Sequence, residues 1–120
     1  LFIQGIGMAV VFLGLGFTIW ARIHLGSNWS NQPTLKKEHE LVTSGPYRLV
    51  RHPIYTGILA AMLGTILVSS SASAWIINFI IFAILFAWRI PIEERIMMQQ
   101  FPNQYPDYKK QIKALVPFIW

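Results

Sequence analysis

The sequence has no cysteine and few charged residues. The absence of cysteine excludes disulfide bonds, thiolate metal ligands and cysteine nucleophiles. Charged residues make up 12% of the 120 residues and hydrophobic residues 54%, whereas a soluble domain usually carries about 25% charged residues. A soluble fold would have no interior for so many apolar side chains, so the composition predicts a membrane protein.

Acidic residues are scarcer than basic ones. Five Asp and Glu stand against ten Lys and Arg, which gives a net charge of +5. Such an excess can indicate nucleic-acid binding, but here the cations collect in two clusters between apolar segments. That placement is typical of a membrane boundary. We therefore expect a lipid bilayer as the partner and no nucleic acid.

Three long apolar runs are the most prominent feature of the sequence. They predict three transmembrane helices at about residues 2–24, 53–70 and 74–92, because a crossing helix needs about 20 apolar residues. Pro53 suits the first turn of the second helix, where its missing N–H would be unpaired anyway. Small residues that predict close helix packing line the first run: Gly5, Gly7, Ala9, Gly14 and Gly16.

The basic residues indicate the orientation. Half lie between the first and second apolar runs and half at or after the end of the third, whereas the serine-rich turn at 69–73 has none. Because Lys and Arg accumulate on the cytoplasmic side, we expect the N-terminus outside and the C-terminus inside. The predicted fold is a single all-α integral membrane domain over residues 1–120, with a cytoplasmic loop at 26–52 and an amphipathic tail of one or two helices at 93–116. The start at Leu1, inside an apolar run, indicates a fragment of a larger helical bundle.

Polar side chains gather at the expected cytoplasmic ends of the second and third helices. His52 and Tyr55 stand three residues apart, and Arg89 and Glu93 four apart, so each pair shares one helical face. The serine-rich turn should make the two helices a hairpin in which these pairs face each other. Arg89 lies inside the apolar run, at a cost of about 2.5–3.5 kcal/mol. It either pairs with Glu93, extends to lipid headgroups or binds an anionic substrate.

Other kinds of site have little support. His39 and His52 could form a metal pair, but no carboxylate stands at a recognised ligand spacing, so we predict no metal site. The sequence has no serine nucleophile turn and no glycine-rich phosphate loop. Spacing alone thus predicts a polar pocket at the cytoplasmic end of a membrane hairpin, without specifying a reaction.

Two motifs resemble a known family. Residues 39–57 (HELVTSGPYRLVRHPIYTG) and 89–119 (RIPIEERIMMQQFPNQYPDYKKQIKALVPFI) together resemble the isoprenylcysteine carboxyl methyltransferases, and phospholipid methyltransferases share a looser version. The stretch 25–30 (LGSNWS) is similar to the prokaryotic branch. Pro102 stands where the family commonly has glycine, a departure that touches no expected catalytic residue.

The resemblance implies a membrane enzyme that binds S-adenosylmethionine (SAM) at its cytoplasmic face and methylates a carboxylate on a prenylated cysteine or another lipid-like acceptor. It implies that Arg89 holds the acceptor carboxylate and that Glu93 binds the amino group of the cofactor. The other residues implied for the cofactor pocket are Gln32, His39, Glu40, Leu41, Val42, Tyr47, His52, Pro53, Ile54 and Tyr55.

The resemblance also implies a location in the plasma or inner membrane of a prokaryote, with the active site facing the cytoplasm. Two other functions stay open. In a phospholipid or amine N-methyltransferase, Arg89 would hold a phosphate group. In a non-catalytic membrane scaffold, Arg89 and Glu93 would serve as an internal ion pair. Binding of the cofactor separates the scaffold from both enzymes.

Overall fold

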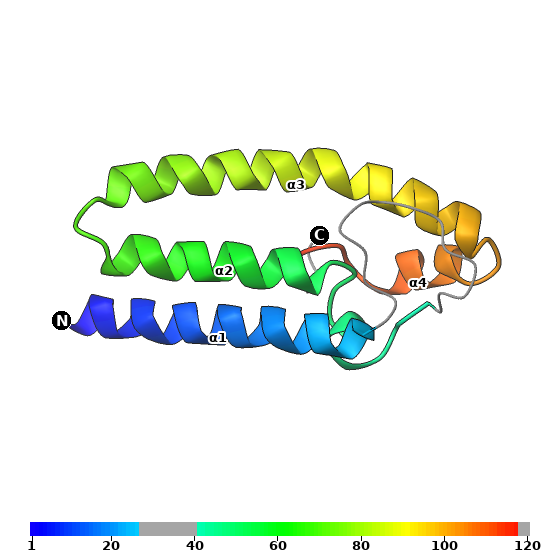
Figure 1. The fold of residues 1–120 in the computed structure, drawn as a ribbon, viewed down its shortest axis with the longest axis horizontal. Helices are drawn as coiled ribbons and strands as arrows, with labels where there is room; N and C mark the ends of the chain where they lie inside the picture. Colours follow the sequence, from blue (N-terminus) through cyan, green and yellow to red (C-terminus); the bar gives the residue numbers. More distant parts are fainter. Residues whose placement is uncertain (27–40, 118–120) are drawn as a thin grey trace.

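The structure is a computed structural model that describes residues 1–26 and 41–117, and within those residues it contains helices and no strands. Three long helices lie side by side with α2 in the middle, and a short helix, α4, lies close to the C-terminal end of α3 (Figure 1). The predicted all-α class is confirmed. The helices are α1 (Phe2–Leu25), the 3-10 helix η2 (Gly45–Arg48), α2 (Pro53–Val68), α3 (Ala72–Gln100) and α4 (Tyr105–Gln111).

Helices α1 and α3 are long and apolar enough to cross a membrane. They have 24 and 29 residues, and the mean hydropathy of their most apolar segments is 2.0. Many of their large apolar side chains are exposed, Phe12, Leu13, Ile84 and Trp88 among them. Exposed apolar faces of this extent suit contact with lipid or with further helices.

Helix α2 is shorter than predicted. It begins at Pro53, as expected, but it ends at Val68 instead of residue 70, so its 16 residues extend over about 24 Å. The serine-rich turn ends it, because the Ser69 hydroxyl accepts a hydrogen bond from the Ser71 backbone N–H (2.9 Å) and favours a turn over further helix. Within the described residues, two helices therefore have full membrane-spanning length and α2 does not.

Helix α3 is longer than predicted. We expected the third apolar helix to end near residue 92 and an amphipathic tail to begin at 93, but α3 continues to Gln100. Pro91 lies inside it and removes one backbone donor without ending the helix. In the next turn, Glu93 contacts Tyr55 of α2 and Glu94 contacts Arg51, and these contacts offset the lost hydrogen bond. Of the expected tail, only α4 is a separate helix, and Glu93 belongs to α3.

Two glycines of α1, Gly7 and Gly14, pack directly against α2. A Cβ atom built on Gly14 would lie 2.6 Å from the Gly57 carbonyl oxygen and from the Ala61 nitrogen, which is too close for any real side chain. Thr18 Oγ1 donates a hydrogen bond to the Gly14 carbonyl oxygen (2.9 Å). It also lies 3.5 Å from the carbonyl oxygen of Ile54 in α2.

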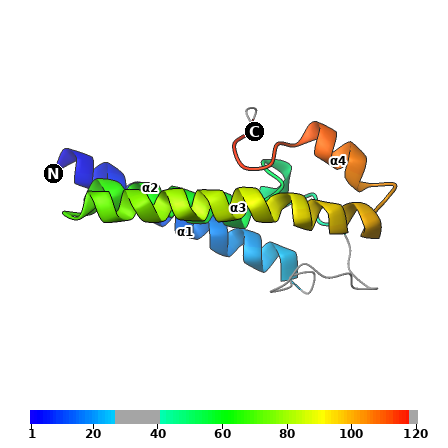
Figure 2. The ribbon, with the colours of Figure 1, turned by 90° about the horizontal axis from the view of Figure 1, so that it is seen from above.

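Figure 2 shows α1 crossing α2 and α3 at an angle. The close packing predicted from small residues is confirmed at Gly7 and Gly14. At Gly5 and Gly16 no described residue lies within 4 Å of a Cβ atom, so these two positions do not take part in it.

The last described residues, 112–117, form a strap that joins the tail to the head of α2. The backbone N–H of Arg51 donates to the Lys113 carbonyl oxygen (2.8 Å), and that of His52 donates to the Ala114 carbonyl oxygen (3.0 Å). These bonds satisfy donors that stand before the first turn of α2 and have no partner within it. The strap thereby fixes the segment that carries His52.

Apolar packing closes this end of the molecule. Ala114 and Leu115 of the strap form a buried cluster with Ile90 of α3, and Tyr55 and Leu59 of α2 pack against that cluster. The strap therefore holds α2 and α3 together at the end where the polar side chains gather.

The glycine contact provides a matched pair of variants. We expect Gly14→Ala to lower the free energy of unfolding by about 1–3 kcal/mol, the usual cost of overpacking. Gly16→Ala should keep or raise it, because nothing lies within 4 Å of a Cβ atom there and alanine is the better helix former. Unfolding of the full-length protein by SDS in detergent micelles, followed by circular dichroism, measures both. Equal losses would contradict close α1–α2 packing.

Candidate active site

A carboxylate on α3 collects polar groups from the facing ends of α2 and α3. Glu93 Oε1 accepts hydrogen bonds from Arg89 Nε (2.8 Å), four residues earlier on the same helix, and from the Tyr55 hydroxyl of α2 (2.6 Å). Of the three alternatives for Arg89, the structure shows the pairing with Glu93, and the predicted approach of the two helix ends is confirmed. The Arg89 side chain is 36% exposed and that of Glu93 22%, so a ligand can reach both.

His52 lies between two carboxylates. Its Nδ1 is 3.6 Å from Glu93 Oε2, and its Nε2 is 3.4 Å from Glu94 Oε2. The imidazole stacks on the Tyr55 ring (centroids 5.7 Å apart, planes at 6°), and Tyr55 stacks on Phe86 of α3 (4.2 Å, 11°). These stacked rings restrict how far His52 and Tyr55 can turn.

Glu94 forms a second cluster on the neighbouring face of α3. Only 6% of this residue is exposed. Its Oε2 lies 2.6 Å from Arg51 Nη1 and accepts a hydrogen bond from the Tyr105 hydroxyl of α4 (2.9 Å), while Lys109 Nζ is 3.9 Å from Oε1. Because consecutive helical residues point about 100° apart, Glu93 and Glu94 gather largely separate partners.

Burial keeps the tyrosines around these carboxylates protonated. Loss of solvation, with a smaller effect from the charge of Glu93, raises the pKa of Tyr47 in η2 to about 12. Burial also raises the pKa of Tyr105 and of Tyr108 well above the usual value for a phenol. Tyr108 donates its hydroxyl hydrogen to the Tyr47 carbonyl oxygen (2.7 Å). At neutral pH these phenols are therefore hydrogen-bond donors and not bases.

The other residues predicted for the cofactor pocket lie around the head of α2. Tyr47 and Pro53 are buried, and the Ile54 carbonyl oxygen faces α1. Leu41 and Val42 are half-buried in the segment that precedes η2. The structure thus brings His52 and Tyr55 to Arg89 and Glu93. The five residues just described belong to the head of α2 or to the segment that leads to it. Three predicted residues lie outside the described ranges: Gln32, His39 and Glu40.

The sequence interpretation assigns no role to three residues of these clusters, Arg51, Glu94 and Tyr105. Glu94 directly follows Glu93, and Tyr105 falls among the apolar positions of the tail, so neither has a distinctive pattern. One signal is nevertheless present: Ile90 and Met98, four residues to either side, place Glu94 on an apolar stripe of α3. A carboxylate there needs a cation from another element.

The Glu93 cluster fits the chemistry of SAM. A partly exposed carboxylate can bind the ammonium group of the methionine part, and the ring of Tyr47 can face the sulfonium cation. Arg89 presents a planar guanidinium that matches a carboxylate or a phosphate. In the part of the chain that the structure describes, no group of three or more His, Asp or Glu side chains has a metal-binding arrangement.

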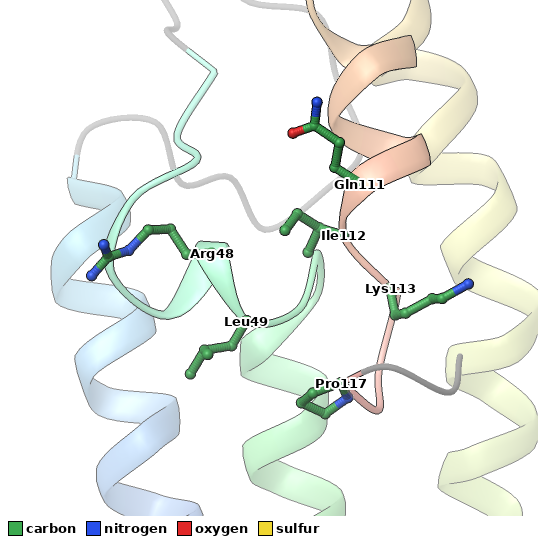
Figure 3. Close-up of a pocket in the computed structure, with 6 residues that line it drawn as sticks. All are labelled: Arg48, Leu49, Gln111, Ile112, Lys113 and Pro117. Atoms are coloured by element: carbon green, nitrogen blue, oxygen red, sulfur yellow. The ribbon is translucent and has the colours of Figure 1, made fainter.

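A hollow of about 120 Å³ lies between η2 and the strap, away from the Glu93 cluster. Figure 3 shows the side chains of Arg48 and Lys113 pointing away from each other, so the hollow does not present a converging pair of cations. We assign it no part in the site. The residues that line it are Arg48, Leu49, Gln111, Ile112, Lys113 and Pro117.

Comparison with known proteins identifies relatives over nearly the whole chain. The phospholipid methyltransferase family matches residues 3–104. Protein-S-isoprenylcysteine O-methyltransferase B of Arabidopsis thaliana is 32% identical over 119 residues, which cover 98% of this chain and 60% of the relative. A probable protein-S-isoprenylcysteine O-methyltransferase of Oryza sativa subsp. indica is 33% identical over 112 residues, with coverages of 93% and 53%.

A solved structure shares the fold. The eukaryotic intramembrane Ras methyltransferase ICMT (isoprenylcysteine carboxyl methyltransferase) superposes with a TM-score of 0.85 at 32% identity, over 98% of this chain and 43% of that one. The chain thus spans about half the length of the relatives that it matches. On the combined agreement of sequence and fold, the chain belongs to the phospholipid methyltransferase family, and its resemblance to the isoprenylcysteine carboxyl methyltransferases is confirmed.

Proposed function

We propose that this chain carries the active site of a membrane SAM-dependent methyltransferase that esterifies the carboxylate of a prenylated cysteine or of a similar lipid-like acceptor. Relatives named for this reaction match nearly the entire chain. The observation that carries the proposal is the pair of opposite charges on Arg89 and Glu93, joined to Tyr55 at the ends of two apolar helices. A polar cluster in this position can receive a water-soluble cofactor and a lipid-anchored acceptor together.

In this proposal Glu93 binds the amino group of the cofactor and Arg89 binds the acceptor carboxylate. Each side chain meets a ligand group of opposite charge, and charge-assisted hydrogen bonds are the strongest that proteins form. Tyr55 holds Glu93 from the α2 side. The four-residue spacing puts both ligand groups on one face of α3, so the two ligands lie side by side.

The head of α2 and the segments before it line the rest of the cofactor pocket. Tyr47 faces the sulfonium, where the electron-rich face of its ring stabilises a cation. Tyr55 lines the pocket with its hydroxyl edge, because its ring stacks on His52 and Phe86. The remaining pocket residues in this proposal are Gln32, His39, Glu40, Leu41, Val42, His52, Pro53 and Ile54.

Bound SAM supplies a methyl group whose bond to sulfur breaks as its bond to the acceptor carboxylate oxygen forms, and the sulfur keeps the electron pair. The protein contributes alignment of the two ligands and exclusion of water. Because carboxylate and sulfonium neutralise each other as they react, a site of low polarity favours the step. The acceptor carboxylate is already ionised at neutral pH, so the reaction needs no general base.

The proposed topology has three membrane crossings, with the N-terminus outside and the C-terminus inside. The ten basic residues then fall on the cytoplasmic side, and the active site faces the cytoplasm from the plasma or inner membrane of a prokaryote. With 16 residues, α2 crosses only where the bilayer thins locally or where flanking residues contribute.

A second candidate is N-methylation of a phospholipid or amine, which the name of the matching family favours. Arg89 would then bind the phosphate of the headgroup. A base would also be needed, because an ammonium group has no lone pair to methylate until it loses a proton.

Labelled methyl transfer distinguishes these acceptors. We expect the full-length protein in membranes to transfer tritiated methyl from SAM to an ester that mild alkali hydrolyses, since a carboxyl methyl ester is base-labile. Alkali releases an ester methyl group as volatile methanol, so label that enters the phospholipid fraction and stays non-volatile after alkali would establish the second candidate. A protein that binds SAM but transfers no label to any membrane component would contradict both enzymes.

The role of Arg89 can be tested by separating binding from turnover. We expect Arg89→Ala to lower kcat/KM for the acceptor about a hundredfold, because a hydrogen-bonded charge pair contributes about 1.5–3 kcal/mol. The Kd of SAM should rise by no more than about tenfold, because Arg89 is assigned to the other ligand and affects SAM only through its hydrogen bond to Glu93 (2.8 Å). Arg95→Ala, an exposed arginine on the same helix, is the control. Normal turnover by Arg89→Ala would exclude this role.

The role of Glu93 concerns the cofactor. We expect Glu93→Gln to raise the Kd of SAM at least about tenfold, because the amide keeps the shape of the side chain but loses the charge that binds the ammonium group. Isothermal titration calorimetry in detergent measures the change. Asp107→Asn on α4 removes an exposed carboxylate and should leave the Kd unaltered. Equal Kd values for wild type and Glu93→Gln would show that the ammonium group binds elsewhere.

A further inference from the structure

Among the described residues, Glu94 is the charged residue that the structure buries, and the proposed reaction gives it no role. A buried carboxylate is costly unless cations and hydrogen-bond donors compensate it. The compensating groups come from two distant parts of the chain, Arg51 and His52 before α2 and Tyr105 on α4. Glu94 therefore ties both parts to α3.

A series of contacts leads from Glu94 to Glu93. Glu94 Oε2 lies 2.6 Å from Arg51 Nη1 and 3.4 Å from His52 Nε2. The His52 ring lies parallel to that of Tyr55, and the Tyr55 hydroxyl donates to Glu93 Oε1 (2.6 Å). Movement of the segment that Glu94 holds would therefore change the position of the hydroxyl that binds Glu93.

We infer that Glu94 is a positioning residue of the active site: it touches neither ligand, but it holds Arg51 and His52 so that Tyr55 presents its hydroxyl to Glu93. The inference rests on the proposed function, in which Glu93 binds the cofactor. The strap supports it, because the backbone N–H groups of Arg51 and His52 are also held there (2.8 and 3.0 Å). Backbone and side-chain bonds thus restrain the same two residues from different sides.

A double-mutant cycle on SAM binding tests this role in the full-length protein in detergent. We expect Glu94→Gln to raise the Kd about tenfold and Tyr55→Phe to raise it by a similar factor. The double variant should lose no more than either single variant, because both changes interrupt one series of contacts. Independent contributions of the two residues to binding would give losses that multiply, and an ion pair that only stabilises the fold would leave the Kd of Glu94→Gln unchanged. Losses that multiply, or an unchanged Kd in Glu94→Gln, would overturn the inference.

Tyr105→Phe addresses the case in which Glu94→Gln does not fold. It removes one hydrogen bond to Glu94 and keeps the carboxylate and its charge. We expect a rise in the Kd of about threefold, the effect of one weaker hydrogen bond. An unchanged Kd in this variant would also count against the inference. Asp107→Asn, an exposed carboxylate on the same helix as Tyr105, is the matched control and should bind SAM as the wild type does.

An NMR measurement separates failure of this inference from failure of the proposed function. The ¹⁵N shifts of the His52 ring report its protonation and hydrogen bonding, and they can be assigned by comparison with His52→Gln. In protein without SAM, Glu94→Gln should shift the Nε2 signal, and an unshifted signal would overturn the inference. If the wild type binds no SAM, the proposed function fails. A shifted Nε2 signal in Glu94→Gln would still support the contact between Glu94 and His52.

Discussion

Two adjacent carboxylates near the end of a long apolar helix must each be neutralised, and this requirement organises one end of the molecule. Glu93 and Glu94 point about 100° apart, so each needs partners of its own. Glu93 pairs with Arg89 on the same helix, a contact that helical spacing alone provides. Glu94 pairs with Arg51, which stands before α2. The first pair is local, whereas the second requires the head of α2 to lie against α3.

The distant pair also accounts for the position of the tail. The hydrogen bond from Tyr105 to Glu94 keeps α4 beside α3, and the strap that follows α4 bonds to the backbone of Arg51 and His52. As a result His52 is held by its backbone, by two carboxylates and by a stacked tyrosine ring. A reaction that depends mainly on alignment of two ligands benefits from side chains fixed in this way before the ligands arrive.

Features set by local spacing could be predicted from the sequence, and features set by distant contacts could not. The four-residue spacing of Arg89 and Glu93 gave their ion pair as one of three alternatives, and the serine-rich turn predicted the hairpin that brings His52 to them. Proline usually ends or bends a helix, but α3 continues through Pro91. The next turn is stabilised by contacts with other elements, such as the ion pair between Glu94 and Arg51. The bond from Arg51 to the strap has no periodic signal at all, since it joins backbone groups far apart in the chain.

The protonation states of the carboxylates and tyrosines around Glu93 and Glu94 favour one acceptor over the other. Glu93 and Glu94 are both engaged in ion pairs, the pKa of Tyr47 is raised to about 12, and burial also raises the pKa of Tyr105. An amine acceptor with a pKa near 10 must lose a proton before it can be methylated. Removing that proton would require a carboxylate to give up its cation, or His52 to act as the base between two carboxylates. A carboxylate acceptor needs no base and matches the guanidinium of Arg89, so the charges of this cluster favour esterification over N-methylation.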